Sequence, residues 1–426
     1  MRRSLLPRFL HATPVLAALA VSGAMVGQAQ AAPDTWSGFY VGADLGYGMG
    51  ATKLVIGDFF EWNALGSQGG SVGAFAGYNQ QFGDWVAGFE FGGTLSDVQG
   101  HTELVSGPDS IGTQTLTDWS AGVTARLGYV VSPSTLLFAG LGGKVYHGLG
   151  RLKEDGITQY EDDDQFTGMG VVTVGIETVL SGNVRIRAQY DLDLLQANDY
   201  GGLVVTPMVG TAKASILYAI GDAAASEPVD AAKWAGFYAG AVGGQTIGVA
   251  TLRIGDDTDY FSHAGFGSAG WTGGVVAGYN LSVTERLLLG FEGGVSASTS
   301  RTFVGLATEE DGFQGTNDWW IDARLRAGYL TSQETMLYGF AGLTRMHSTL
   351  GTVDDGEWTG GETTFERNGA TIGAGIEAQV TDNLLLRAEY AYSLFEEYDM
   401  SGGGGFMTLT QRQQTATVGV IYRFNE

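Results

Sequence analysis

The sequence contains no cysteine, and it has few prolines and few charged residues. Without cysteine, disulfide scaffolds, thiolate metal sites and lipid attachment through a terminal cysteine are excluded. Only 16% of the 426 residues are charged, and 46 acidic side chains outnumber 22 basic ones. This acidic balance argues against nucleic acid as a partner and against clamps for anionic lipids. We therefore predict a chain with no nucleic-acid partner.

Long apolar runs are also absent once the first 31 residues are set aside, so no spanning helix is predicted. The first 31 residues have the pattern of an export signal. Arg2, Arg3 and Arg8 form a positive start, residues 9–26 are mostly apolar, and Ala29–Ala31 is a small-x-small cleavage site. Cleavage there leaves 395 residues, with 19 basic side chains against 46 acidic ones, a net charge of −27. Only a closed β-barrel could then cross a membrane, because it satisfies all its backbone groups internally.

Glycine, by contrast, is abundant, with 69 glycines against 7 prolines. No Gly-X-Y period accompanies them, which excludes collagen, and 44% hydrophobic residues are too many for a disordered chain. The glycines must therefore lie in ordered structure, and they disfavour helices. These observations predict an all-β fold.

The chain is written twice. The segment Trp36–Tyr40 returns at Trp234–Tyr238, and Arg187–Tyr190 returns at Arg387–Tyr390, with offsets of roughly 198 to 202 residues over the whole chain. Two copies of one unit are thus joined head to tail. The predicted organisation is a signal peptide over 1–31, a first eight-stranded unit over 32–222, a periplasmic linker over 223–233 and a second eight-stranded unit over 234–426.

Apolar and polar residues alternate along each unit, most clearly over residues 184–194. There the even positions are apolar and the odd positions are charged or polar, so the two sets lie on opposite sides of the strand. Tight turns alternate with long polar segments near 51–68, 98–114, 150–164 and 197–208, and aromatic residues cluster near strand ends. Strands of about 10 to 14 residues with this asymmetry are typical of a transmembrane antiparallel up-and-down barrel. The predicted strands are 37–50, 69–82, 84–97, 115–131, 134–149, 165–181, 182–196 and 209–221, then 235–250, 268–283, 285–300, 316–331, 334–350, 366–381, 383–398 and 410–424.

Four short motifs carry a resemblance to a known family: Trp36–Gly42, Gly77–Asn79, Arg126–Tyr129 and Val420–Phe424. In their order and spacing they resemble the opacity-type, or immunogenic porin-family, outer-membrane β-barrel proteins of Gram-negative bacteria. The tandem duplication departs from that family, and so do the two residues after Phe424.

The resemblance implies an outer-membrane barrel that maintains the envelope and meets surface or host partners through its loops. It implies outer-membrane lipids and lipopolysaccharide as surroundings, and no cofactor or catalytic activity. It also implies that the barrel assembly machinery reads the terminal aromatics Tyr422 and Phe424.

Sixteen strands can close as two eight-stranded barrels or as one sixteen-stranded barrel. Eight strands leave a bore that side chains fill, whereas sixteen leave an aqueous channel. The alternation of side chains along each strand places many glycines and matched charges on the inward face, which suits two narrow bores plugged by ion pairs. The alternative is a diffusion porin for small solutes. The predicted interior charge network comprises Glu90, Arg126, Glu177 and Arg187, with their equivalents Glu292, Arg326, Glu377 and Arg387.

Other chemistry-bearing residues are given ordinary roles. His147 and His347 lie near the loop end of equivalent strands, as in outer-membrane lipid-modifying enzymes, but no third group repeats beside them. Acidic runs at 161–164, 309–311 and 354–355 fit no defined calcium loop and are expected to be solvated surface. We predict no catalytic, cofactor-binding or metal-binding residue.

Overall fold

The computed structural model describes residues 34–56, 60–106, 108–195, 198–199, 203–221, 229–256, 258–306, 311–399 and 406–424, and nearly all of them lie in strands. The strands of the first unit are β1 (Gly38–Ile56), β2 (Phe60–Phe82), β3 (Trp85–Ser106), β4 (Asp109–Ser132), β5 (Thr135–Glu154), β6 (Ile157–Ser181), β7 (Val184–Leu195) and β9 (Leu203–Ile220). Those of the second unit are β10 (Gly236–Gly255), β11 (Asp259–Ser282), β12 (Leu287–Leu306), β13 (Asp311–Ser332), β14 (Thr335–Asp354), β16 (Thr363–Gln379), β17 (Leu384–Asp399) and β18 (Phe406–Arg423).

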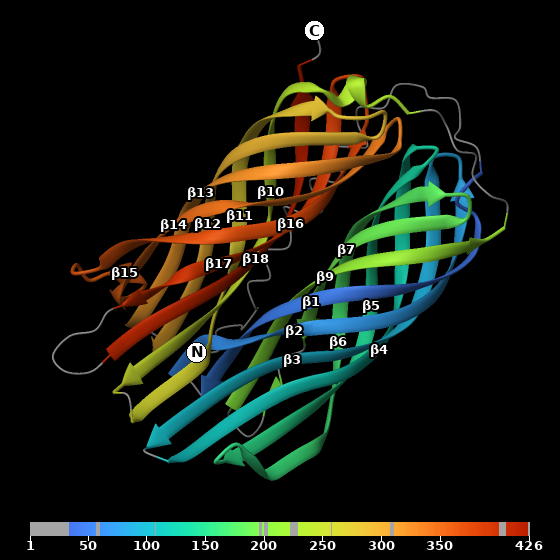
Figure 1. Cartoon of the computed structure of the whole chain (residues 1–426). Coiled ribbons are helices and arrows are strands. Elements are labelled where there is room, and N and C mark those ends of the chain that lie inside the picture. The colour runs from blue at the N-terminus through green and yellow to red at the C-terminus, as the bar shows by residue number, and fades with distance from the viewer. Residues whose placement is uncertain are drawn as a thin grey trace, which may run out of the picture.

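Each unit closes on itself as an antiparallel barrel (Figure 1). In the first unit β1 pairs with both β2 and β9, so that Tyr40 lies opposite Gly77 on one side and Ala219 on the other. In the second unit β10 pairs in the same way with β11 and β18. Two further strands, β8 (Asn198–Asp199) and β15 (Glu357–Trp358), pair for only two residues each with β9 and β14. The prediction of tandem eight-stranded barrels is confirmed, and each barrel removes its own sheet edges.

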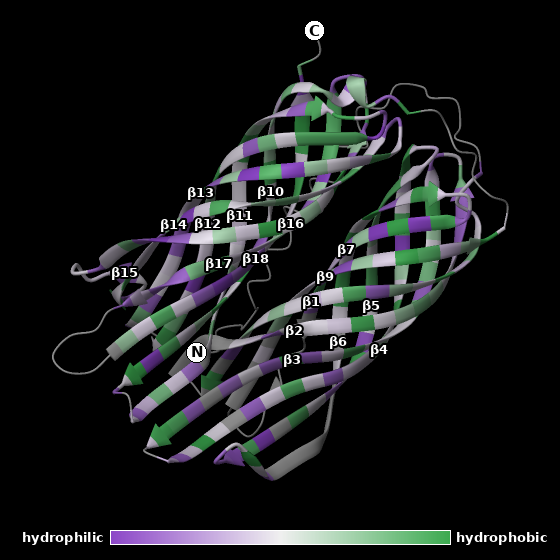
Figure 2. Ribbon diagram, in the orientation of Figure 1, coloured by the Kyte–Doolittle hydropathy of each residue, from purple (hydrophilic) through white to green (hydrophobic). Residues whose placement is uncertain are grey.

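Hydrophilic and hydrophobic residues alternate along many of the strands (Figure 2), and the two faces of each wall differ accordingly. Apolar side chains such as Leu141 and Leu343 are 67% and 72% exposed on the outer wall, whereas charged side chains line the bores. Near the tight turns, aromatic rings meet in pairs on the outer wall, for example Phe39 with Tyr78 at 4.9 Å between ring centroids. Such a band suits lipid, with aromatic rings at its edge.

The strands are longer than the sequence pattern suggested. The segments predicted as polar loops near 51–68, 98–114 and 150–164 are largely paired strand, so the walls continue beyond the apolar band. Bulges mark the transition at equivalent positions, between Thr117 and Trp119 and between Asn317 and Trp319. Polar residues can form a strand as well as apolar ones can when both faces of the strand meet water. The polar composition of these segments therefore predicted loops where the structure has strands.

The two barrels lie side by side (Figure 1), and equivalent residues of the two units meet between them. Ile176 and Ile376 share one buried cluster, Met49 and Ile247 share another, and the hydroxyls of Thr135 and Thr335 share a hydrogen bond. Beyond the bilayer band, the end of β3 also pairs with the start of β11. Because equivalent residues of the two units meet, the contact resembles the two-fold interface of a homodimer within a single chain.

A short 3₁₀ turn, η1 (Ala231–Trp234), precedes the second barrel and closes its base. Asp230 caps the turn by accepting a hydrogen bond from the backbone N–H of Ala232 at 3.0 Å. Ala231, in the predicted linker, and Trp234, the first residue of the predicted second unit, are fully buried, so the end of the linker is docked onto the barrel. Residues 223–228 of the predicted linker, and the predicted signal, lie outside the described residues. In the described part of the chain, no helix is long and apolar enough to cross a membrane.

Candidate functional site: the interiors of the two barrels

The predicted interior charges of the first unit meet in the middle of its bore. Glu177, on β6, accepts charge-assisted contacts from Arg126 on β4 at 3.2 Å and from Arg187 on β7 at 3.0 Å. Glu90, on β3, is 2.7 Å from the Arg187 guanidinium and 3.4 Å from that of Arg126. Tyr40 of β1 donates its hydroxyl to Glu90 at 3.0 Å and accepts from Arg126 at 2.6 Å. Four charges and one phenol thus cross-link the strands through the lumen.

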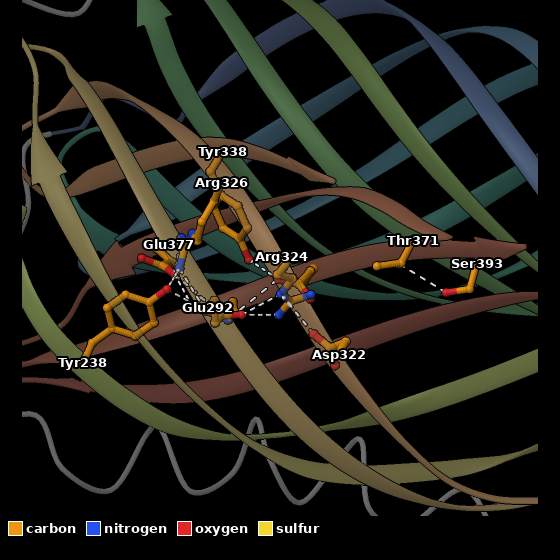
Figure 3. A network of polar contacts seen from close by, with 11 residues as sticks. Tyr238, Glu292, Asp322, Arg324, Arg326, Tyr338, Thr371, Glu377 and Ser393 are labelled. Carbon is orange, nitrogen blue, oxygen red and sulfur yellow. Dashed lines mark hydrogen bonds and ion pairs between the residues drawn. The ribbon is translucent and has the colours of Figure 1, made fainter. Parts of the chain in front are cut away.

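The second bore carries the same arrangement on the equivalent strands (Figure 3). Arg326 lies 3.0 Å from Glu292 and 2.8 Å from Glu377, while Arg387 lies 2.7 Å and 2.6 Å from the same two carboxylates. Tyr238 donates to Glu292 at 2.8 Å and accepts from Arg326 at 2.6 Å. All eight residues of the predicted network are therefore brought together as two sets of four.

Glycine makes room for this filling. A Cβ built on Gly77 would lie 2.3 Å from the Tyr40 hydroxyl, and one on Gly175 would lie 2.5 Å from the Phe138 ring. The Arg126 guanidinium in turn stacks 3.9 Å from the centroid of the Phe138 ring. Inward glycines are thus the counterpart of large inward rings, because any side chain there would displace a ring or the wall.

A tryptophan seals the turn end of each bore. Trp36 and Trp234, which open the repeated motif, are 1% and 0% exposed. Arg185 stacks over Trp36 at 4.4 Å from its ring centre, and Arg423 stacks over Trp234 at 5.1 Å. Each bore is therefore closed below its ion network by an aromatic plug with an arginine on it.

A second tier of charge lies above the network of the first barrel and was not predicted as part of it. Lys144 on β5 contacts Asp191 at 2.9 Å and Asp193 at 3.0 Å, and Lys213 on β9 contacts Asp191 at 3.2 Å. Lys144, Asp191, Lys213 and Asp44 border a cavity of about 40 Å³, which has room for roughly one to three water molecules. Parity could have found Asp191 and Asp193, since both share the inward face of β7 with Arg187.

The second barrel has a different upper tier. Arg324 contacts Glu292, Glu389 at 2.7 Å and Asp322 at 3.5 Å (Figure 3). Tyr338 completes it by donating its hydroxyl to Glu389 at 2.5 Å. These residues are not conserved in type between the two units, so the repeat that exposed the lower network could not expose this one.

The two histidines point away from the bores. His147 stacks on Trp119 with ring centroids 5.6 Å apart, and His347 stacks on Trp319 at 5.2 Å. Ser348, which follows His347, faces the opposite side of the wall and donates to Asn317 at 3.1 Å. Neighbouring strand residues point to opposite faces, so this serine and this histidine cannot act as a nucleophile and its base.

The acidic runs form no ligand cluster among the residues that the structure describes. The side chains of residues 161–167 and all of residues 307–310 lie outside the described set. Of the others, Asp311 accepts the backbone N–H of Asp355 at 2.7 Å across a hairpin end. That contact organises a turn and leaves no array of oxygen ligands.

The predicted assembly aromatics lie at the turn end of β18, on the outer wall. Tyr422 and Phe424 are 48% and 53% exposed, and their ring centroids are 5.1 Å apart. The backbone N–H of Phe424 donates to the carbonyl of Phe237 at 2.9 Å, which extends the pairing of β18 with β10. The closing seam of the second barrel therefore ends in two exposed rings.

These features define a class: a bacterial outer-membrane β-barrel protein with two barrels whose bores are filled by side chains. The chain matches the model of the outer membrane protein beta-barrel domain twice, over residues 16–209 and 215–424, and it belongs to that family. The prediction of an outer-membrane location is confirmed.

Relatives match over the length of about one unit. The chain is 27% identical over 207 residues to the 31 kDa outer-membrane immunogenic protein of Brucella melitensis, covering 46% of this chain and 86% of the relative. It is 30% identical over 196 residues to the 22 kDa outer membrane protein of Rhizobium leguminosarum bv. viciae, covering 46% and 80%. Among solved structures, Neisserial surface protein A is similar at 17% identity, with a TM-score of 0.27 over 44% of this chain and 97% of that one. That likeness is weak, and the fold rests on the strand pairing.

Proposed function

We propose that this protein is a non-conducting outer-membrane scaffold, which contributes to envelope structure and presents its outer hairpins for surface interaction. The observation that carries the proposal is the filling of both bores by a tryptophan plug and a cross-strand ion network. In this proposal, residues 1–31 direct export and residues 223–233 link the barrels on the periplasmic side. The chain has no catalytic role in this reading.

The filling argues against diffusion. Arg187 and Glu177 are fully buried, and they contact each other across adjacent strands while reaching Glu90 and Arg126 on other strands. A solute crossing the bore would have to break these contacts, and leaving one buried charge unpaired costs roughly 3–5 kcal/mol. A porin instead keeps an open, water-filled lumen, which wider barrels provide.

The walls beyond the apolar band support a surface role. On the outer face of the second barrel, Leu343 is followed two residues on by Arg345, which pairs with Glu366. Asn368 donates to Glu396 at 3.3 Å on the next strand. This polar belt lies directly above apolar positions, at the level where lipopolysaccharide head groups and external partners would be met.

The exposed aromatics of β18 support a role in assembly. Tyr422 and Phe424 lie on the closing seam, next to Phe237 and on the proposed periplasmic side, where the barrel assembly machinery would bind. In the first unit Ile220 stands at the position that corresponds to Phe424, so the aromatic ring is missing there. We propose that one signal serves both barrels.

Planar-bilayer recordings of the purified full chain test the closed-bore proposal. We expect no large, steady openings, because each bore is blocked at two levels. Long-lived openings of uniform size in the folded wild-type protein would contradict it. The double variant Arg187→Ala with Glu177→Ala serves as a control. It removes the central ion pair from the bore of the first barrel and should increase the ion conductance.

Topology and surface exposure are tested with single cysteines in this cysteine-free chain. Glu362→Cys, beside a long hairpin, should react with a membrane-impermeant maleimide on intact cells. Glu285→Cys, in a tight turn, should react only after lysis, and the reverse pattern would invert the proposed topology.

The surface role is tested by cell adhesion. Cells carrying a two-residue turn in place of residues 351–363 should be retained less on matrix-coated surfaces than wild-type cells. Equal retention would argue against that hairpin as the contact.

A further inference from the structure

The bore of the second barrel contains a buried arginine, above the ion network, with no acidic partner among the described residues. Arg367, on β16, is 4% exposed. Its Nη2 donates to the hydroxyl of Ser348 at 3.3 Å and to the side-chain oxygen of Gln411. Nε and Nη1 have no hydrogen-bond acceptor in the described part of the chain. Three of the five guanidinium N–H groups are therefore unsatisfied.

The polar groups of the bore at this level are uncharged, and they come from β11, β12, β13, β14 and β18. Asn317 links this ring together, since it accepts from Ser348 at 3.1 Å and donates to Ser268 at 3.4 Å. Two further members, Ser300 and Gln413, each have a side-chain oxygen without a partner among the described residues. We call this set the amide ring: Ser268, Ser300, Asn317, Ser348, Gln411 and Gln413, all less than 9% exposed.

An apolar layer separates the amide ring from the carboxylates below it. Trp320, Met346 and Phe395 form one buried cluster on the inward face, one step above the Asp322 and Arg324 tier in the strand register. The nearest acid along β16, Glu366, is adjacent to Arg367 in sequence and faces the outer wall, where it pairs with Arg345. Neither source of negative charge reaches the Arg367 guanidinium.

This arrangement is costly unless an anion completes it. A guanidinium does not lose its proton in proteins, so Arg367 cannot become neutral to escape burial. Phe365 and Phe395 flank it at 5.2 Å and 5.7 Å from their ring centres, and they hold the guanidinium in place without supplying a charge. Buried charges in proteins are normally paired.

We propose that the amide ring and Arg367 bind a small oxyanion, either a carboxylate or a phosphate group. The free N–H groups of Arg367 would supply charge-assisted hydrogen bonds, and the Ser300 hydroxyl would donate one more. This inference concerns the second bore only, and it does not depend on the proposed surface role. The first unit has Thr167 at the equivalent sequence position, so it lacks the cation.

Calorimetric titration of the purified full chain in zwitterionic micelles tests the site. Sodium acetate and inorganic phosphate are the two probes, each titrated in a chloride background of matched ionic strength. We expect saturable binding of one equivalent of at least one probe, and the probe that binds more tightly identifies carboxylate or phosphate as the natural group. Arg367→Gln should weaken that binding at least tenfold. Arg345→Gln removes an arginine of the same barrel from the outer wall and should leave it unchanged.

Folding is checked in each variant by the heat-modifiable mobility typical of barrels. If Arg367→Gln does not fold, Arg367→Lys and Ser300→Ala provide the test, and each should weaken binding severalfold. Absence of saturable binding of both probes to the folded wild-type protein would overturn the proposal. Equal affinity in the wild type and in the folded Arg367 and Ser300 variants would also overturn it.

Discussion

Replacing Glu177 by glutamine should destabilise the first barrel strongly, because this one carboxylate serves three arginines. Arg126, Arg185 and Arg187 lie 3.2, 3.3 and 3.0 Å from it, and its side chain is fully buried. Glutamine keeps the shape but removes the charge. In the described part of the chain Arg185 then loses its sole acidic partner, while the other two keep Glu90.

The size of the effect follows from burial. Removing one partner of a buried ion pair costs roughly 3–5 kcal/mol, because the remaining charge stays desolvated. No reduction for solvent screening applies at a site without exposure. With a denaturant dependence of about 2–3 kcal/mol per molar urea, the unfolding midpoint should fall by roughly 1–2.5 M.

The duplicated chain supplies a matched comparison. Glu377, the equivalent residue, contacts Arg326 and Arg387, and both of these also contact Glu292. Glu377→Gln therefore leaves both Arg326 and Arg387 in contact with Glu292, and it should cost only about 1–3 kcal/mol, the value of lost charge-assisted hydrogen bonds. The order of the two effects is thus predicted as well as their size.

Urea-dependent pulse proteolysis in micelles, with fragments of each barrel resolved by mass spectrometry, reports the two midpoints separately. Glu285→Gln, in an exposed turn, is the surface control and should stay within about 0.5 kcal/mol of wild type. A loss below about 1 kcal/mol for Glu177→Gln, or a larger loss for Glu377→Gln, would refute the view that buried ion pairing organises the bores.

Three other outcomes follow from the structure. Leu141→Arg places a charge on the lipid-facing wall, so it should cost about 2–4 kcal/mol near the midplane and reduce heat-modifiable folding; unchanged folding would mean that the assigned facing is wrong. Ser134→Cys with Ser332→Cys should form a disulfide under mild oxidation, since the native hydroxyls are 2.8 Å apart; halves that separate after cleavage at a protease site engineered between the barrels would show that the barrels do not dock. Phe424→Ser should lower the yield of both folded barrels in outer-membrane fractions, and a normal yield of the first barrel would show that it assembles on its own signal.

The strands and the repeated units of this protein could be predicted from its sequence. The period of two assigns every strand residue to one face of the wall, and the repeat identifies Glu90, Arg126, Glu177 and Arg187 through their equivalents. Both signals can be read without knowing which strands pair, which is why the all-β fold, the two units and the inward direction of the lower networks could be predicted. The repeat could not reveal residues that differ between the units, such as Lys144 in one upper tier and Arg324 in the other.

The tertiary structure decided which strands close each ring, how far the strands continue, and what each inward charge meets. The alternation along a strand shows which face a residue occupies, but it does not show which residue it meets across the bore. That depends on the closure of the barrel, where β1 and β9 pair over a long sequence separation. Likewise, the isolation of Arg367 from carboxylates depends on an apolar layer drawn from three strands. The sequence determined the wall and its two faces, whereas the tertiary structure determined the plugs, the contact between the barrels and the burial of Arg367 away from carboxylates.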